Sequence, residues 1–162
     1  MKRVFFSACL ACALAIPLFA EAGPFGLGLV VGEPTGLSAS LRLNKAAMLQ
    51  GTAAWDLTSP GGITLAADYL FLFDDAFRIE KTAIPLYIGF GAKLVILMGD
   101  GRYGDDDSAI GIAARIPMGI RWLFDDLPLE AFLELSPGVR LFPETAFDAG
   151  GGIGLRWYFE RK

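Results

Sequence analysis

The chain has 162 residues, enough for one domain, and 54% of them are hydrophobic, with 20 glycines and a net charge of −4. It contains no histidine and only two cysteines, which excludes a Ser-His-acid hydrolase and leaves few routes to a transition-metal site. The negative charge and the lack of a basic patch argue against a nucleic-acid partner.

The first 22 residues have the organisation of a secretory signal peptide. Lys2 and Arg3 precede an apolar stretch over 4–20, and small residues then stand at the positions that a signal peptidase reads. We therefore expect a signal peptide at 1–22 and a mature domain at 23–162. A helical membrane anchor is the alternative interpretation of the apolar stretch.

Both cysteines, Cys9 and Cys12, would leave with the signal peptide. The mature chain then has no thiol, so its fold depends on packing and closure rather than on disulfides. Without Lys2, Arg3 and Glu21, the 14 basic and 18 acidic residues fall to 12 and 17, a net charge of −5.

Beyond the N-terminus, apolar residues alternate with polar or small ones in eight segments separated by turn signals. We interpret the segments as β-strands, and they cover 25–31, 36–43, 46–56, 62–73, 84–98, 109–124, 128–142 and 147–159. We expect 74–83 to be a longer charged connection. No uninterrupted apolar run of about 18 residues follows the signal, so the high hydrophobic content fits a membrane β-barrel better than a spanning helix.

The segment 109–124 shows the pattern most clearly. Its alternate residues are apolar from Ile110 to Phe124, whereas the other row holds small residues together with Arg115 and Arg121. A period of two places the rows on opposite faces of a strand. We expect the apolar row to face lipid and the arginines to face the barrel interior.

Charged residues within the eight segments all fall on the row opposite the apolar one. The predicted interior set has six basic and five acidic members: Arg42, Asp56, Asp68, Lys93, Arg115, Arg121, Glu130, Glu134, Arg140, Asp148 and Arg156. A lone charge in a narrow lumen carries a large desolvation cost, which a paired charge offsets. The near balance therefore predicts a side-chain network that plugs the lumen; a narrow channel for small solutes or ions is the alternative.

Aromatic residues collect near the ends of the apolar rows, as in a membrane-interface girdle. The predicted interface aromatics are Phe25, Trp55, Phe71, Phe73, Trp122, Phe124, Trp157 and Phe159. Small residues pad the charged rows, as the narrow interior of an eight-stranded barrel requires. The competing architecture is a soluble periplasmic barrel that turns its apolar rows inward and binds an apolar ligand.

Two further features bear on the site and on the fold. The Gly- and Asp-rich loop at 99–108 has the oxygen-rich character of a calcium loop but lacks EF-hand spacing, so we expect a solvated surface loop and no metal.

Pro85, Pro117 and Pro137 lie within or beside strands, where each removes a ladder hydrogen bond, so we expect bulges or strand ends there.

The chain resembles the small eight-stranded outer-membrane barrels of the OmpA/OmpX type. Four runs also resemble a family of uncharacterised bacterial outer-membrane barrels: G-E-P-T-G-L-S at 32–38, I-P-L-Y at 84–87, R-I-P-M-G at 115–119 and P-L-E-A-F-L-E at 128–134. The resemblance implies a fold and a location rather than an activity. The chain departs from such barrels at its end, where three charged residues follow Phe159.

The sequence therefore predicts an all-β, eight-stranded antiparallel transmembrane barrel in the outer membrane of a Gram-negative-type cell, with both termini in the periplasm. We expect no catalytic residues and no cofactor, and a structural or interaction role in the envelope. The expected partners are outer-membrane lipid and, during biogenesis, the barrel-assembly machinery, and we expect a monomer.

Overall fold

The computed structural model describes residues 24–56, 62–79, 82–97, 109–124 and 126–159. All regular secondary structure in these ranges is β-strand: β1 (Phe25–Glu33), β2 (Gly36–Arg42), β3 (Ala47–Asp56), β4 (Gly62–Ile79), β5 (Thr82–Leu97), β6 (Ala109–Arg115), β7 (Met118–Leu123), β8 (Leu129–Phe142) and β9 (Ala146–Phe159). Among the described residues, no helix has the length and apolar character needed to cross a membrane.

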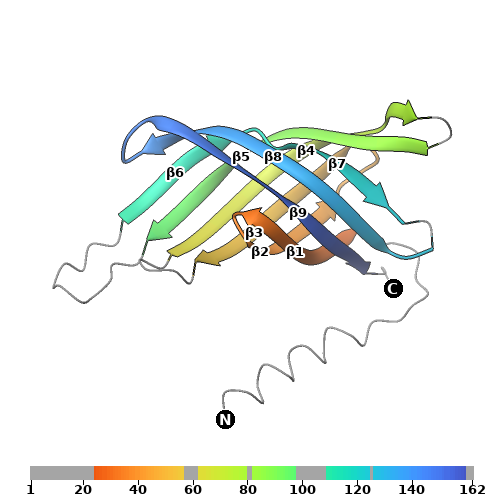
Figure 1. Cartoon of the computed structure of the whole chain (residues 1–162), viewed down its shortest axis with the longest axis horizontal. Helices are drawn as coiled ribbons and strands as arrows, with labels where there is room; N and C mark the ends of the chain where they lie inside the picture. Colours follow the sequence, from red (N-terminus) through yellow and green to blue (C-terminus); the bar gives the residue numbers. More distant parts are fainter. Residues whose placement is uncertain (1–23, 57–61, 80–81, 98–108, 125, 160–162) are drawn as a thin grey trace, which may run out of the picture.

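The strands form one closed antiparallel ring, tilted as in Figure 1. β1 closes the ring because it pairs with both β2 and β9, so that Phe25 lies opposite Leu41 on one side and Phe159 on the other. β6 and β7 follow one another between β5 and β8 and share one position in the wall. The ring thus has eight positions, and the predicted all-β, eight-stranded antiparallel barrel is confirmed.

The first and last strands meet at one end of the barrel, which we call the terminal end; the opposite end is the distal end. The turns after β2 and β7 and the hairpin between β4 and β5 lie at the terminal end, whereas the turns after β1 and β8 lie at the distal end (Figure 1). At the turn after β2, the Asn44 side chain accepts a hydrogen bond of 2.8 Å from the Ala46 amide, which closes this tight connection.

Two prolines explain the break between β6 and β7. Pro117 interrupts the predicted strand 109–124, but the chain continues in the same position of the wall: Ile116 donates its amide to the Pro137 carbonyl at 2.8 Å, and Gly89 donates to the Pro117 carbonyl at 2.8 Å. Each proline lacks the amide that would return the second bond. The wall therefore lacks two backbone hydrogen bonds at this point, but the pairing register is the same on both sides of the break.

The hairpin between β4 and β5 corrects one prediction. Residues 74–83 were expected to form a charged connection, but β4 continues to Ile79 and β5 begins at Thr82. The pairing register shifts between Phe73 and Phe77, across from Pro85. The shift interrupts the period of two, so the charged stretch lost the alternation by which a strand is recognised.

The faces of the strands are arranged as predicted, with apolar residues outside and charges inside. On β6 and β7, Ile112 and Ile120 are 44% and 42% exposed, whereas Arg115 and Arg121 are only 4% and 1% exposed. The same alternation runs along the other strands. A barrel with an apolar interior would show the reverse arrangement.

Glycines on the inner face make room for large side chains. A Cβ at Gly154 would lie 2.2 Å from the Phe132 ring, and one at Gly26 would lie 2.8 Å from Ser40 Oγ. The inward residues of β1 are small, namely Gly26, Gly28 and Val30. The interior is therefore filled from the other strands.

Candidate functional site

The buried centre of the barrel is built around two carboxylates of β8. Glu130 accepts hydrogen bonds from Arg121 Nη1 at 3.0 Å, from Arg156 Nη1 at 2.9 Å and from the Tyr158 hydroxyl at 3.0 Å. Glu130 and Arg156 have no exposed surface. Asp74 extends this Glu130 cluster toward the terminal end, where it accepts a hydrogen bond of 2.7 Å from Arg121 Nη2.

Glu134 lies four residues further along β8, on the same inward row. It accepts hydrogen bonds from Arg115 Nη2 at 2.6 Å, from the Tyr87 hydroxyl at 2.9 Å and from Gln50 Nε2 at 2.7 Å. Arg115 Nε also lies 3.1 Å from Asp68 Oδ1. Residues from β3, β5 and β6 thus converge on one carboxylate of β8, and Asp68 of β4 joins this Glu134 cluster through Arg115.

Gln50 joins the two clusters into one network. Its amide nitrogen donates to Glu134, while its carbonyl oxygen accepts a hydrogen bond from Arg156 Nη2. Arg156 also donates to Ser38 Oγ at 3.0 Å and lies over the Phe132 ring, 3.8 Å from its centroid. Seven of the eight wall positions contribute a side chain, and β1 is the exception.

The network leaves some buried polar atoms without a hydrogen-bond partner among the described residues. These are both carboxylate oxygens of Asp68, together with Nε of Arg115 and Nε of Arg121. Asp68 and Arg115 are close enough for an ion pair, but their atoms are not aligned for a hydrogen bond. The Asp68 contact is therefore the least satisfied part of the interior.

The predicted interior charges are placed in three groups. Six of them belong to the two clusters: Asp68, Arg115, Arg121, Glu130, Glu134 and Arg156. Lys93 and Asp148 form a separate pair, with Nζ 2.5 Å from Oδ2. Arg42 is half-buried and Arg140 is exposed, and neither forms an ion pair with another described residue, while the Asp56 side chain lies outside the described residues.

Several members of the network carry no charge or lay outside the predicted strands. Gln50, Ser38, Tyr87 and Tyr158 sit on inward rows, and their position on these rows was the only available signal. Asp74 lies in the stretch for which the sequence predicts a connection, whereas the structure places it on β4. The hydrogen-bond partners of such polar residues can be predicted only when the register of the neighbouring strands is known.

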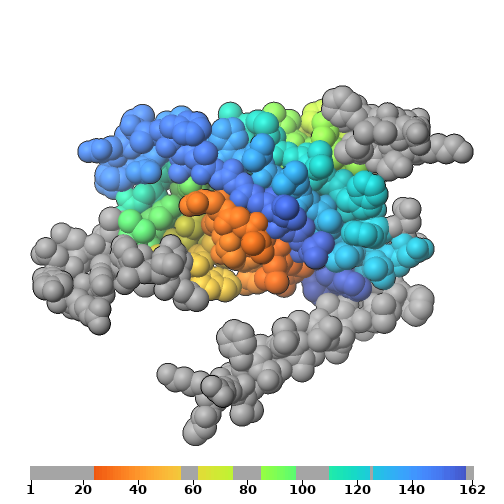
Figure 2. Space-filling view, in the orientation of Figure 1, coloured from red at the N-terminus to blue at the C-terminus, as the bar shows by residue number. Residues whose placement is uncertain are grey.

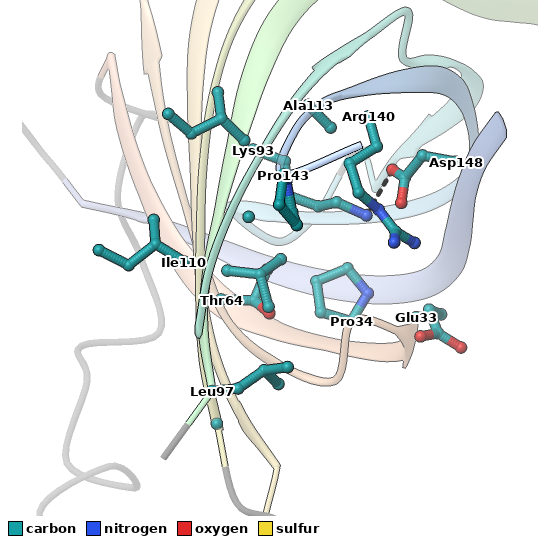
Figure 3. A pocket seen from close by; sticks show the side chains of 14 residues that line it. Glu33, Pro34, Thr64, Lys93, Leu97, Ile110, Ala113, Arg140, Pro143 and Asp148 are labelled. Atoms are coloured by element: carbon teal, nitrogen blue, oxygen red, sulfur yellow. Dashed lines mark ion pairs between the residues drawn. The ribbon is translucent and has the colours of Figure 1, made fainter. Parts of the chain in front are cut away.

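A cavity of about 410 Å³ opens at the distal end (Figure 3). Glu33, Pro34, Lys93, Arg140 and Asp148 line it together with apolar residues of β5 and β6. Lys93 and Asp148 form their ion pair within it, and the Arg140 guanidinium lies beside Asp148. The distal cavity is therefore lined by one ion pair, Lys93 and Asp148, and by two further charged residues, Glu33 and Arg140.

The predicted interface aromatics lie on the outer face but are unevenly distributed. Seven of the eight lie toward the terminal end, where Phe25 and Phe159 stack with ring centroids 6.1 Å apart. Trp55, 51% exposed, is the predicted member at the distal end. Phe142 and Phe147, exposed by 54% and 75% near the distal turn, were not predicted.

The described residues contain no group of three or more acidic, histidine or cysteine side chains that would hold a metal ion. The loop at 99–108 and the signal peptide at 1–22 lie outside the described residues.

The crystal structure of the N-terminal β-barrel domain of Pseudomonas aeruginosa OprF is similar to this chain, with a TM-score of 0.66 and 13% sequence identity. The similarity covers 86% of this chain and all of that domain, and it shows the barrel fold. No family model and no curated protein matches the chain. The comparison thus supports the barrel fold alone, and it does not support the finer resemblance to a family of uncharacterised barrels.

Proposed function

We propose that this chain is an integral outer-membrane β-barrel that does no chemistry and has a structural or interaction role in the cell envelope. The observation that carries the proposal is the contrast between the two faces of the wall. Exposed Leu, Ile, Val and Phe side chains cover the outside, and the buried charges lie inside. Water favours the opposite arrangement, whereas lipid favours this one.

The interior network supports a plugged lumen. Glu130, Glu134 and Gln50 connect side chains from opposite sides of the ring, with donor-acceptor distances up to 3.0 Å in both clusters. A path for ions would have to separate these contacts in a barrel whose width admits little more than its own side chains. We therefore favour a closed barrel over a narrow channel.

The proposal includes the partners expected from the sequence. Outer-membrane lipid contacts the apolar face, the barrel-assembly machinery inserts the chain, and the inserted barrel is a monomer. Export depends on the signal peptide at 1–22, and both termini face the periplasm.

Fractionation of cells that express the full chain tests the proposal. The protein should be found in the outer-membrane fraction and should migrate differently on a gel with and without boiling, because a closed barrel resists unfolding by detergent. Recovery in the soluble periplasmic fraction would contradict the membrane location. A soluble periplasmic protein of similar size serves as the fractionation control.

A further inference from the structure

Asp68 is buried on the inward row of β4, away from both ends of that strand. Its side chain has no exposed surface, and neither of its carboxylate oxygens has a hydrogen-bond partner. β9 lies opposite β4 in the ring, and Figure 2 shows its atoms packed against those of β1 and β8 over the middle of the barrel. An ionised carboxylate in such a place loses its hydration without compensation.

The neighbouring strands fix the position of the Asp68 side chain. Gln50 and Gly91 lie directly opposite Asp68 on β3 and β5, and Arg115 follows Gly91 in the same row on β6. A Cβ at Gly91 would lie 2.1 Å from Asp68 Oδ1, so the carboxyl group occupies the space that a side chain would fill. Asp68 thus lies over a glycine and beside Arg115.

The other buried cations are balanced without Asp68. The Glu130 cluster joins two guanidinium groups to two carboxylates, namely Arg121 and Arg156 to Glu130 and Asp74. Lys93, the inward cation of β5, lies 2.5 Å from Asp148. None of these three cations forms an ion pair with Asp68.

The Glu134 cluster, by contrast, has one carboxylate too many. Arg115 is its only cation among the described residues, and the two carboxylates of Glu134 and Asp68 share it. Two buried carboxylates beside a single cation do not both ionise at low cost, and such a pair titrates as a unit. One proton held by the pair would restore the charge balance.

Hydrogen bonds decide which of the two carboxyl groups holds the proton. Glu134 accepts three of them, at 2.6–2.9 Å, from a guanidinium, a phenol and an amide group, and these stabilise its ionised form. Asp68 accepts none, and its contact with Arg115 Nε at 3.1 Å is not aligned for one. The proton therefore belongs on Asp68.

We propose that the folded barrel binds one proton at Asp68, beside Arg115 and over the Gly91 backbone. The unfolded chain releases this proton above about pH 5, because an aspartate side chain in water has a pKa of about 3.9. The folded state then binds more protons than the unfolded state, so the stability of the barrel falls as the pH rises. The proposal depends on the packing of the interior and not on the membrane location.

Infrared spectroscopy detects the proton directly, because a protonated carboxyl group has a carbonyl band that an ionised one lacks. The full chain is folded in detergent micelles near neutral pH, without any substitution. We expect one protonated-carboxyl band that shifts when the aspartates are labelled with ¹³C. A spectrum without the band would overturn the site, and a band that shifts only with labelled glutamate would overturn the assignment to Asp68.

A neutral variant of the same shape tests the assignment to the residue. Asp68→Asn should abolish the infrared band. Between about pH 5 and pH 7, the folding equilibrium constant of the wild type should fall by up to about tenfold per pH unit relative to that of the variant, as one proton requires. Asp126→Asn, at an exposed position in the terminal-end turn after β7, is the matched control and should behave as the wild type.

Urea unfolding at each pH measures this difference, and two results would contradict the proposal. Equal pH dependence of the wild type and Asp68→Asn would mean that no proton is bound there. A stability that follows the sodium concentration but not the pH would mean that a monovalent cation balances the cluster instead. Cell fractionation tests the membrane location separately, because a protein that shows the band but is recovered in the soluble fraction contradicts only that location.

Discussion

Glu130 and Arg156 are direct cross-strand partners on β8 and β9, and their side chains form an ion pair of 2.9 Å without any exposed surface. Each also has further partners: Arg121 of β7 and Tyr158 of β9 donate to Glu130, and Arg156 donates to Ser38 of β2 and Gln50 of β3. The pair therefore links the β8–β9 ladder to the opposite wall. Removing either charge would leave the other buried.

We expect Glu130→Gln to destabilise the barrel by about 3–5 kcal/mol, because Arg156 would lose its only carboxylate partner among the described residues. Urea unfolding in lipid vesicles, followed by tryptophan fluorescence, measures the change. Glu144→Gln, at an exposed position in the distal turn, is the control and should unfold at the wild-type midpoint. Equal midpoints for the two variants would show that Glu130 is not part of a packed interior.

A second prediction concerns close packing at Gly154. Its Cβ would lie 2.2 Å from the Phe132 ring and 2.6 Å from the Leu29 carbonyl oxygen, so we expect Gly154→Ala to cost about 1–3 kcal/mol. Gly51→Ala is the matched control, since the nearest atom to its Cβ would be 3.9 Å away. The same urea experiment should show a lower midpoint for Gly154→Ala and an unchanged midpoint for Gly51→Ala. An unchanged midpoint for Gly154→Ala would mean that the neighbouring atoms can move to accommodate the methyl group.

A third prediction tests the outer face. Leu133 points outward and is 45% exposed on the middle of β8. If this face contacts lipid, Leu133→Arg should destabilise the barrel by about 2–4 kcal/mol in vesicles. The same change at Leu127, exposed in the terminal-end turn, should have an effect within about 0.5 kcal/mol. A soluble barrel would tolerate both changes equally.

A fourth prediction concerns conduction. Because the two clusters bridge opposite walls, the purified protein should produce no steady single-channel steps in a planar bilayer. A general porin incorporated under the same conditions provides the positive control. Steady steps that scale with the amount of inserted protein would refute the plugged lumen and favour the narrow channel.

The period of two was enough to predict most of the fold. Along the strand with Arg115 and Arg121, alternation identified both the inward and the outward row, because lipid and a crowded lumen select opposite residue types. The same signal failed at the β4–β5 hairpin, since the register shift near Pro85 changes the phase of the pattern. Asp74 continues the inward row of Asp68, but it begins the charged stretch at which the predicted strand ends.

The pairing within the interior could not be predicted from the sequence. Glu130 and Glu134 lie on one inward row, but which arginine each one binds depends on the register of four or more strands. Gln50 is the clearest case: nothing in its local sequence distinguishes it from a solvated glutamine, although it joins both clusters. Arg140 shows the converse, because it shares the inward row but ends in the distal cavity.

The glycine-rich inner row of β1 bears on the order of assembly. Every other position in the wall contributes a side chain to the buried network, whereas β1 presents Gly26, Gly28 and Val30 and is held by its backbone ladders to β2 and β9. Such a strand can enter a nearly complete sheet without passing a long side chain through the charged network. In this geometry β1 is the position of the wall at which the ring can open or close without breaking a side-chain contact of the charged network.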